Sequence, residues 1–108
     1  MITYQDFEKV EMRVGEILEA SLLEGIKKKA YKLKIDVGKF GIKKSAAQIT
    51  KLYKPEDLVG KQVIVVMNFP PKQIGSFISE VLVLGIVQGD GVILLQPERN
   101  APNGAKIA

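Results

Sequence analysis

The sequence predicts an all-β protein, a small barrel of about five strands with short helices and a C-terminal extension. Three observations lead to this prediction. Apolar and charged residues alternate along residues 30–38 with the period of a half-buried strand. Further apolar runs follow, and glycines and prolines separate them at short intervals. The chain has 108 residues, the size of one domain, so we expect residues 1–108 to fold as a single unit.

The first elements are an N-terminal helix and a long strand. Thr3 is a favourable helix N-cap, and Asp6 follows at the spacing of a capping box. A strand is expected over residues 11–23. Its alternation slips between Val14 and Ile17, beside a glycine, which predicts a β-bulge or a bend at that point.

The middle of the chain contains two strands and then a helical turn. Residues 30–38 form the clearest strand, and glycines bound a tight turn before the next strand, expected over residues 42–49. Residues 50–60 interrupt the strands. Thr50 can cap a helical turn there, and Pro55 suits a first helical position.

The last third of the chain is expected to be strands and coil. Apolar runs cover residues 63–67 and 77–87, with a Pro-Pro corner between them. The sequence Gly89-Asp90-Gly91 predicts a hairpin turn into a strand over residues 92–95. The proline-containing tail after it reads as extended coil that lies against the barrel. Together with the helical insert, these strands indicate a closed or nearly closed barrel of the OB type, with a β-sandwich as the alternative.

Two of the strands predict self-association. Residues 63–67 and 81–87 are apolar at consecutive positions, so both faces of each strand need cover, while a barrel of this size has one interior. The helix, the tail or a second copy of the chain must cover the outward side chains. We expect a homodimer, because twofold pairing is the commonest way to cover an exposed apolar patch.

The composition argues against an enzyme. The chain has no cysteine and no histidine, which removes thiolate nucleophiles, imidazole bases and the usual zinc ligands. We therefore expect no catalytic residue, no metal and no cofactor. No run approaches the roughly 20 apolar residues of a membrane span, and the start lacks the basic segment of a signal peptide. We expect a cytoplasmic protein that does not insert into membranes.

The charge of the chain is unevenly distributed. The net charge is +4, with six acidic residues in residues 1–25 and twelve lysines in residues 26–72. Such a basic region attracts phosphates or acidic partners, and a solvated lysine face is the plain alternative. Only Arg13 and Arg99 carry a guanidinium group, so nucleic-acid binding would rely on the phosphate backbone and depend little on base sequence.

Several motifs resemble a known family. Glu11-Met12-Arg13-Val14-Gly15 resembles the opening of the tRNA-binding domain that occurs alone or attached to methionyl- and phenylalanyl-tRNA synthetases. Within that superfamily, residues 43–50 and 68–85 resemble the CsaA-type secretion chaperones. The tRNA-binding branch has S-G-I in the first stretch and S-E-G-M in the second, where this chain differs. The resemblance implies an OB-fold homodimer that binds unfolded or presecretory polypeptides, with tRNA binding as the alternative.

Candidate binding residues lie in these two stretches. The aromatic rings could hold an apolar side chain or stack on a base, or they could fill the barrel end. The hydroxyl and amide groups could bond a peptide backbone or cap strand ends, and the lysines could bind phosphates or carboxylates. Glu80 begins an apolar strand and needs a partner such as Arg13 or a lysine. The predicted site comprises Lys43, Ser45, Gln48, Asn68, Phe69, Lys72, Phe77, Ser79 and Glu80.

Overall fold

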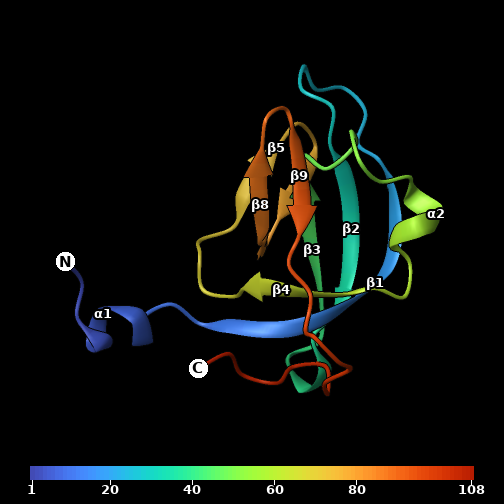
Figure 1. Cartoon of the computed structure of the whole chain (residues 1–108). Helices are drawn as coiled ribbons and strands as arrows, with labels where there is room; N and C mark the ends of the chain where they lie inside the picture. Colours follow the sequence, from blue (N-terminus) through green and yellow to red (C-terminus); the bar gives the residue numbers. More distant parts are fainter.

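The computed structural model describes residues 1–108, and its centre is a five-stranded antiparallel sheet curled into a nearly closed barrel (Figure 1). This is the predicted OB-type architecture. The strand order is β3-β2-β1-β4-β7, so β3 and β7 form the two edges of the curled sheet. The strands are β1 (Met12–Leu22), β2 (Tyr31–Asp36), β3 (Ile42–Ala47), β4 (Gln62–Val66) and β7 (Leu82–Val83).

Smaller elements surround the barrel. The apolar run 77–87, which we expected to be continuous, is divided among three strands, because the chain changes its pairing partner twice along it. The helices are α1 (Tyr4–Glu8), η1 (Gly38–Phe40) and α2 (Pro55–Leu58). The two hairpins are β5 (Lys72–Ile74) with β6 (Phe77–Ser79), and β8 (Gly85–Gln88) with β9 (Gly91–Leu94).

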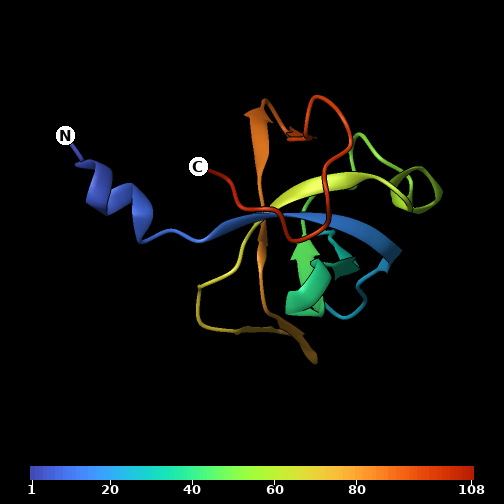
Figure 2. The ribbon, with the colours of Figure 1, turned by 90° about the horizontal axis from the view of Figure 1, so that it is seen from below.

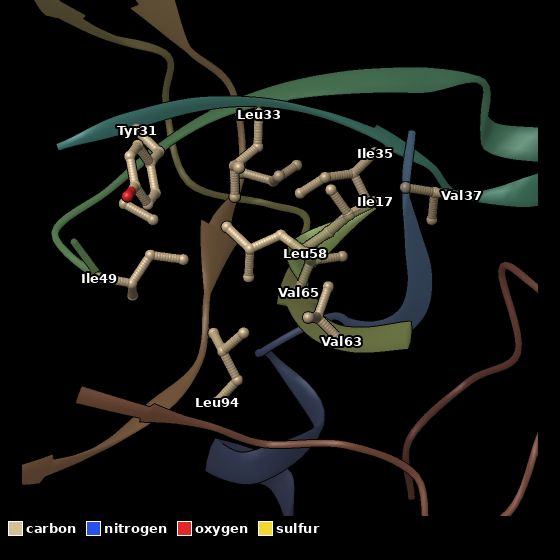
Figure 3. Close-up of a cluster of buried hydrophobic side chains, with 12 residues drawn as sticks. Ile17, Tyr31, Leu33, Ile35, Val37, Ile49, Leu58, Val63, Val65 and Leu94 are labelled. Atoms are coloured by element: carbon tan, nitrogen blue, oxygen red, sulfur yellow. The ribbon is translucent and has the colours of Figure 1, made fainter. Parts of the chain in front are cut away.

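The barrel core is formed by the alternating side chains that the sequence predicted. In β2, Tyr31, Leu33 and Ile35 are buried while the lysines between them are exposed. Leu58 of α2 is completely buried and lies among the strand side chains (Figure 3). The helical insert therefore packs its last residue into the core. The hydroxyl of Tyr31 lies at the edge of the core and donates to the carbonyl of Tyr53 at 2.7 Å.

The structure confirms some local sequence signals and displaces others. The α1 capping box is confirmed, since the Asp6 amide donates to the Thr3 hydroxyl at 3.2 Å and the Thr3 amide to the Asp6 carboxylate at 2.9 Å. Pro55 is the first residue of α2, but Thr50 does not cap it, because the helix begins five residues later. The register shift in β1 lies between Ile17 and Glu19, which is beyond the predicted position.

The C-terminal tail lies along the first half of β1, as expected (Figure 1). The Gly104 amide donates to the Val14 carbonyl at 2.7 Å, and the Ile107 amide donates to the Met12 carbonyl at 2.9 Å. Arg13 strengthens this attachment by donating to the Gly104 carbonyl at 3.0 Å while its guanidinium lies 4.1 Å from the centre of the Phe40 ring.

The apolar strand at residues 63–67 is covered on both faces, as a strand that is apolar at consecutive positions requires. Val63 and Val65 face the core, and the outward side chains of Ile64 and Val66 are also buried within the single chain. No second copy is needed to cover β4. Exposed apolar side chains gather elsewhere, at Leu82, Ile86 and Val87 and along the N-terminal segment.

The helix α1 stands away from the barrel (Figure 2). None of its residues is buried; Tyr4 within it and Ile2 and Val10 on either side are exposed. None of the helices has the length and apolar character that crossing a membrane requires.

Candidate functional site

The candidate site lies at the seam between the two edge strands of the barrel. At one end the seam is closed, because the segment after β6 crosses the edge of β3. The amides of Glu80 and Val81 both donate to the carbonyl of Lys44, at 2.8 and 3.3 Å. Two successive residues opposite one partner form a β-bulge, which bends the chain away from β3 immediately afterwards.

Three side chains complete the closure of the seam. The Lys44 amide donates to the Glu80 carboxylate at 2.9 Å, and the Ala46 amide donates to the Ser79 hydroxyl at 3.0 Å. The hydroxyl of Ser45 donates to the Val81 carbonyl at 2.8 Å. The side chains of Ser79 and Glu80 thus supply acceptors for β3 amides that face away from β2.

The predicted ion pair of Glu80 with Arg13 or a lysine does not form; its partner is the backbone amide of Lys44. Arg13 forms an ion pair with Glu11 at 2.8 Å and supports the tail. The Glu80 carboxylate accepts a hydrogen bond from a backbone amide, and this bond stabilises it in place of an ion pair.

Beyond Ala46 the seam opens into a groove of about 750 Å³. The bend at Glu80 and Val81 carries the chain from β3 to β7 and on to the β8–β9 hairpin. Eleven of the seventeen lining residues are hydrophobic. The lining comprises Ala46, Ala47, Gln48, Ile49, Phe69, Pro70, Lys72, Ile74, Ser79, Glu80, Val81, Leu82, Val83, Leu84, Gly85, Val87 and Val92.

Five of the nine predicted site residues line this groove: Gln48, Phe69, Lys72, Ser79 and Glu80. Phe69 is the largest exposed side chain among them, with 54% of its surface accessible. Its exposure leaves the ring available to contact an apolar group. Lys72 takes part in none of the ion pairs in the structure.

The other four predicted residues lie outside the lining. Ser45 is completely buried, with its hydroxyl bonded across the seam. Asn68 fixes the N-terminal segment, since its amide donates to the Lys9 carbonyl at 2.7 Å and its oxygen accepts from the Glu11 amide at 3.0 Å. Phe77 lies beneath the Lys44 ammonium, which is 5.5 Å from the ring centre, and Lys43 is half-buried on β3.

The sequence reasoning missed one wall of the groove. Leu82, Val83, Gly85 and Val87 line it. The signal was present, because the run 81–87 was recognised as apolar on both faces. The expected cover was the helix, the tail or a second copy, since no local signal indicates that the bulge holds the run away from β3.

A row of charged residues crosses the outer face of the sheet beside the seam. Lys34 lies opposite Lys44 on β3 and opposite Glu19 on β1. Like charges directly opposite each other repel. Here the Glu19 carboxylate, 3.5 Å from the Lys34 ammonium, and the Phe77 ring beside Lys44 offset the repulsion.

The structure offers no group of three or more His, Cys, Asp or Glu side chains that could hold a metal ion. The arrangement is suited to binding, with an apolar groove on one side of β3 and a lysine-rich face on the other.

Comparisons with known proteins identify the family and the fold. Residues 12–106 match the family model described as "Putative tRNA binding domain". A methionine–tRNA ligase of Francisella tularensis is 41% identical over 106 residues, which are 97% of this chain, and the chain spans 15% of the length of that relative.

Two solved structures are similar over the whole chain. The crystal structure of a CsaA chaperone protein from Picrophilus torridus is 56% identical, with a TM-score of 0.95 and complete coverage of both chains. That of the chaperone CsaA from Bacillus anthracis is 47% identical, with a TM-score of 0.95, and the match covers 100% of this chain and 99% of the other.

Proposed function

This chain belongs to the tRNA-binding-domain family and is of its CsaA type, and from that membership we propose that it is a chaperone that binds unfolded polypeptides in the seam groove. The apolar lining of the groove is the observation that carries this proposal. Unfolded chains expose apolar side chains that folded proteins bury, and an open apolar groove can shield them from water. We propose presecretory polypeptides in the cytoplasm as clients and no catalytic activity.

The polar groups of the groove fit a ligand of varied sequence. Gln48 and Lys72, which both line the groove, can each bond a peptide carbonyl, and every peptide offers that group. Few contacts would depend on a particular client side chain. Binding at one groove would therefore be weak and tolerant of sequence.

We also propose that two copies associate, which gives two grooves for one client. The helix α1 has five residues, is buried nowhere against its own barrel and carries exposed apolar side chains. A helix this short is unstable in water unless it packs against something. A second copy is the partner we propose for it, and two linked grooves would raise the affinity for a long client without new contacts.

A binding titration with two matched variants tests the groove. A fluorescent unfolded polypeptide is titrated with the wild type, with Phe69→Ala and with Phe77→Ala. Phe69 lines the groove and Phe77 does not, so we expect Phe69→Ala to weaken binding about tenfold and Phe77→Ala to change it less. Equal affinity of the wild type and Phe69→Ala would remove the groove as the client site.

tRNA binding is the second candidate, and the lysine row on the outer face favours it. Lys32 and Lys34 on β2 are exposed, and Lys44 lies beside them on β3. Lysines in such a row can follow a phosphate backbone without reading bases. If tRNA is the ligand, the logarithm of the affinity falls steeply with the logarithm of the salt concentration, whereas apolar binding of peptide depends little on salt.

A further inference from the structure

The groove is bounded on one side by an unpaired strand edge. The amide of Leu84 donates to the Ile64 carbonyl at 2.9 Å, and its carbonyl accepts from the Leu95 amide at 3.3 Å. Both polar groups of Leu84 therefore point toward β4 and β9. Backbone groups alternate in direction along a strand, so those of Val83 and Gly85 point the opposite way.

The hairpin register extends this edge to Val87. Gly85 pairs with Leu94 and Val87 pairs with Val92. The Leu94 amide donates to the Tyr53 hydroxyl, so it points away from Gly85, and the pair is of the non-hydrogen-bonded kind. The pair of Val87 with Val92, two residues further along the hairpin, is of the same non-hydrogen-bonded kind. No turn, loop or side-chain hydrogen bond uses the backbone groups of Val83, Gly85 or Val87, and all three residues line the groove.

On the opposite wall, beyond the closed end of the seam, backbone groups also lack hydrogen-bond partners. The Ala46 amide is bonded to Ser79, but the amide and carbonyl of Gln48, which follows β3, have no partner among the turn, loop and side-chain hydrogen bonds. Both walls of the apolar groove, at Gln48 and along Val83–Val87, therefore carry backbone groups without a partner.

We propose that the client polypeptide lies in the groove as an added strand and pairs its backbone with the edge formed by Val83, Gly85 and Val87. The inference rests on the proposed function and specifies how the groove recognises its client. Five residues of a strand span roughly 17 Å, and three outward residues offer three donors and three acceptors to an extended chain. Because every peptide carries these groups, pairing of this kind is independent of sequence.

Charge and side-chain contacts select among extended segments. Of the two charged side chains that line the groove, Glu80 already accepts from the Lys44 amide, whereas Lys72 has no ion-pair partner. An apolar segment with one acidic residue near Lys72 complements this lining. The segment has to be unfolded, since a folded client has no free strand edge to pair.

Peptides with methylated backbone amides test the pairing directly. Three versions of one apolar peptide with a single acidic residue are compared: unmethylated, methylated at alternate residues, and methylated at the same number of consecutive residues. Alternate methylation leaves one edge of the peptide intact, whereas consecutive methylation damages both edges. We expect the first two to bind alike and the third to bind at least about tenfold more weakly, from the loss of two or more hydrogen bonds.

A variant of the protein provides the matching test. Val87→Pro removes an amide donor that has no partner within the chain, and Val87→Ala keeps that donor while shortening the side chain. We expect Val87→Pro to bind the unmethylated peptide about fivefold more weakly than Val87→Ala does. Circular dichroism is the folding control, and we expect both variants to keep the strand content of the wild type.

The outcomes separate this proposal from the proposed function. Equal binding of all three peptides would overturn strand addition and leave the groove as a client site. If none of the peptides binds, the proposed function and this inference both fail. If the unmethylated peptide converts a dimer into single subunits, the edge belongs to the subunit interface, and the proposal is overturned in favour of a second copy as the occupant.

Discussion

The hydroxyl of Ser45 and the carbonyl of Val81 are joined by a 2.8 Å hydrogen bond that crosses the seam of the barrel. Both residues are buried, Ser45 completely. This bond ties β3 to the chain just before β7, and the groove opens beside it. This buried hydroxyl is therefore one of the groups that close the barrel where the binding surface begins.

Replacing Ser45 by alanine is expected to destabilise the fold. The Val81 carbonyl would lose its partner in a buried position, which costs about 1–3 kcal/mol of unfolding free energy. Ser21→Ala is the control, because Ser21 is exposed and its side chain makes no hydrogen bond within the chain. Urea unfolding measures both. A Ser45→Ala variant as stable as Ser21→Ala would mean that the bond does not hold the seam.

Two substitutions at Glu80 separate charge from hydrogen bonding. Glu80→Gln keeps an oxygen that can accept from the Lys44 amide, and Glu80→Ala does not. We expect Glu80→Ala to lose about 1–2 kcal/mol of stability and Glu80→Gln to lose clearly less. Thermal unfolding distinguishes them. If Glu80→Gln costs as much as Glu80→Ala, the negative charge matters more than the bond.

Because η1 contacts the tail, replacing Gly38 and replacing Gly41 are expected to lower the stability by different amounts. Gly38 and Gly41 both have positive φ angles, +61° and +90°, so any side chain strains the backbone at either position. A Cβ atom at Gly38 would also collide with the backbone of Asn103, whereas one at Gly41 meets nothing. We expect Gly38→Ala to cost about 1–3 kcal/mol more than Gly41→Ala in urea unfolding. Equal losses would contradict the packing of the tail against η1.

The lysine row predicts a salt signature for tRNA. If phosphates lie along Lys32 and Lys34, replacing each by glutamine lowers the slope of log affinity against log salt by about one. Lys106→Gln, at an exposed lysine of the tail, is the control and should leave the slope nearly unchanged. The slope is measured by filter binding across a salt series. An unchanged slope in the double variant would exclude this face as the tRNA site.

Much of the fold could be predicted because its signals are local. The alternation in β2, the cap at Thr3 and the proline that begins α2 depend on neighbouring residues only, and each was confirmed. The bulge in β1 lies beyond the position predicted beside Gly15. Gly15 is required for a different reason: a Cβ atom there would collide with the Ile35 side chain of the neighbouring strand. That contact is invisible in the sequence.

The binding site was harder to predict, because it depends on long-range pairing. Gln48, Phe69 and Lys72 were placed in the site and line the groove. The roles of Ser79 and Glu80 in closing the seam require β3 to lie beside them, 33 and 36 residues away in the chain. The unpaired edge at Val83–Val87 follows from a change of strand partner, which no local pattern encodes.

The most direct test of the account is a nuclear magnetic resonance titration of amide signals with an unfolded peptide. We predict that the largest shifts occur at Gln48, Phe69 and the amides of Val83, Gly85 and Val87, all of which line the seam groove. Shifts concentrated at Lys32 and Lys34, with the groove amides unchanged, would contradict binding of the peptide in the seam groove.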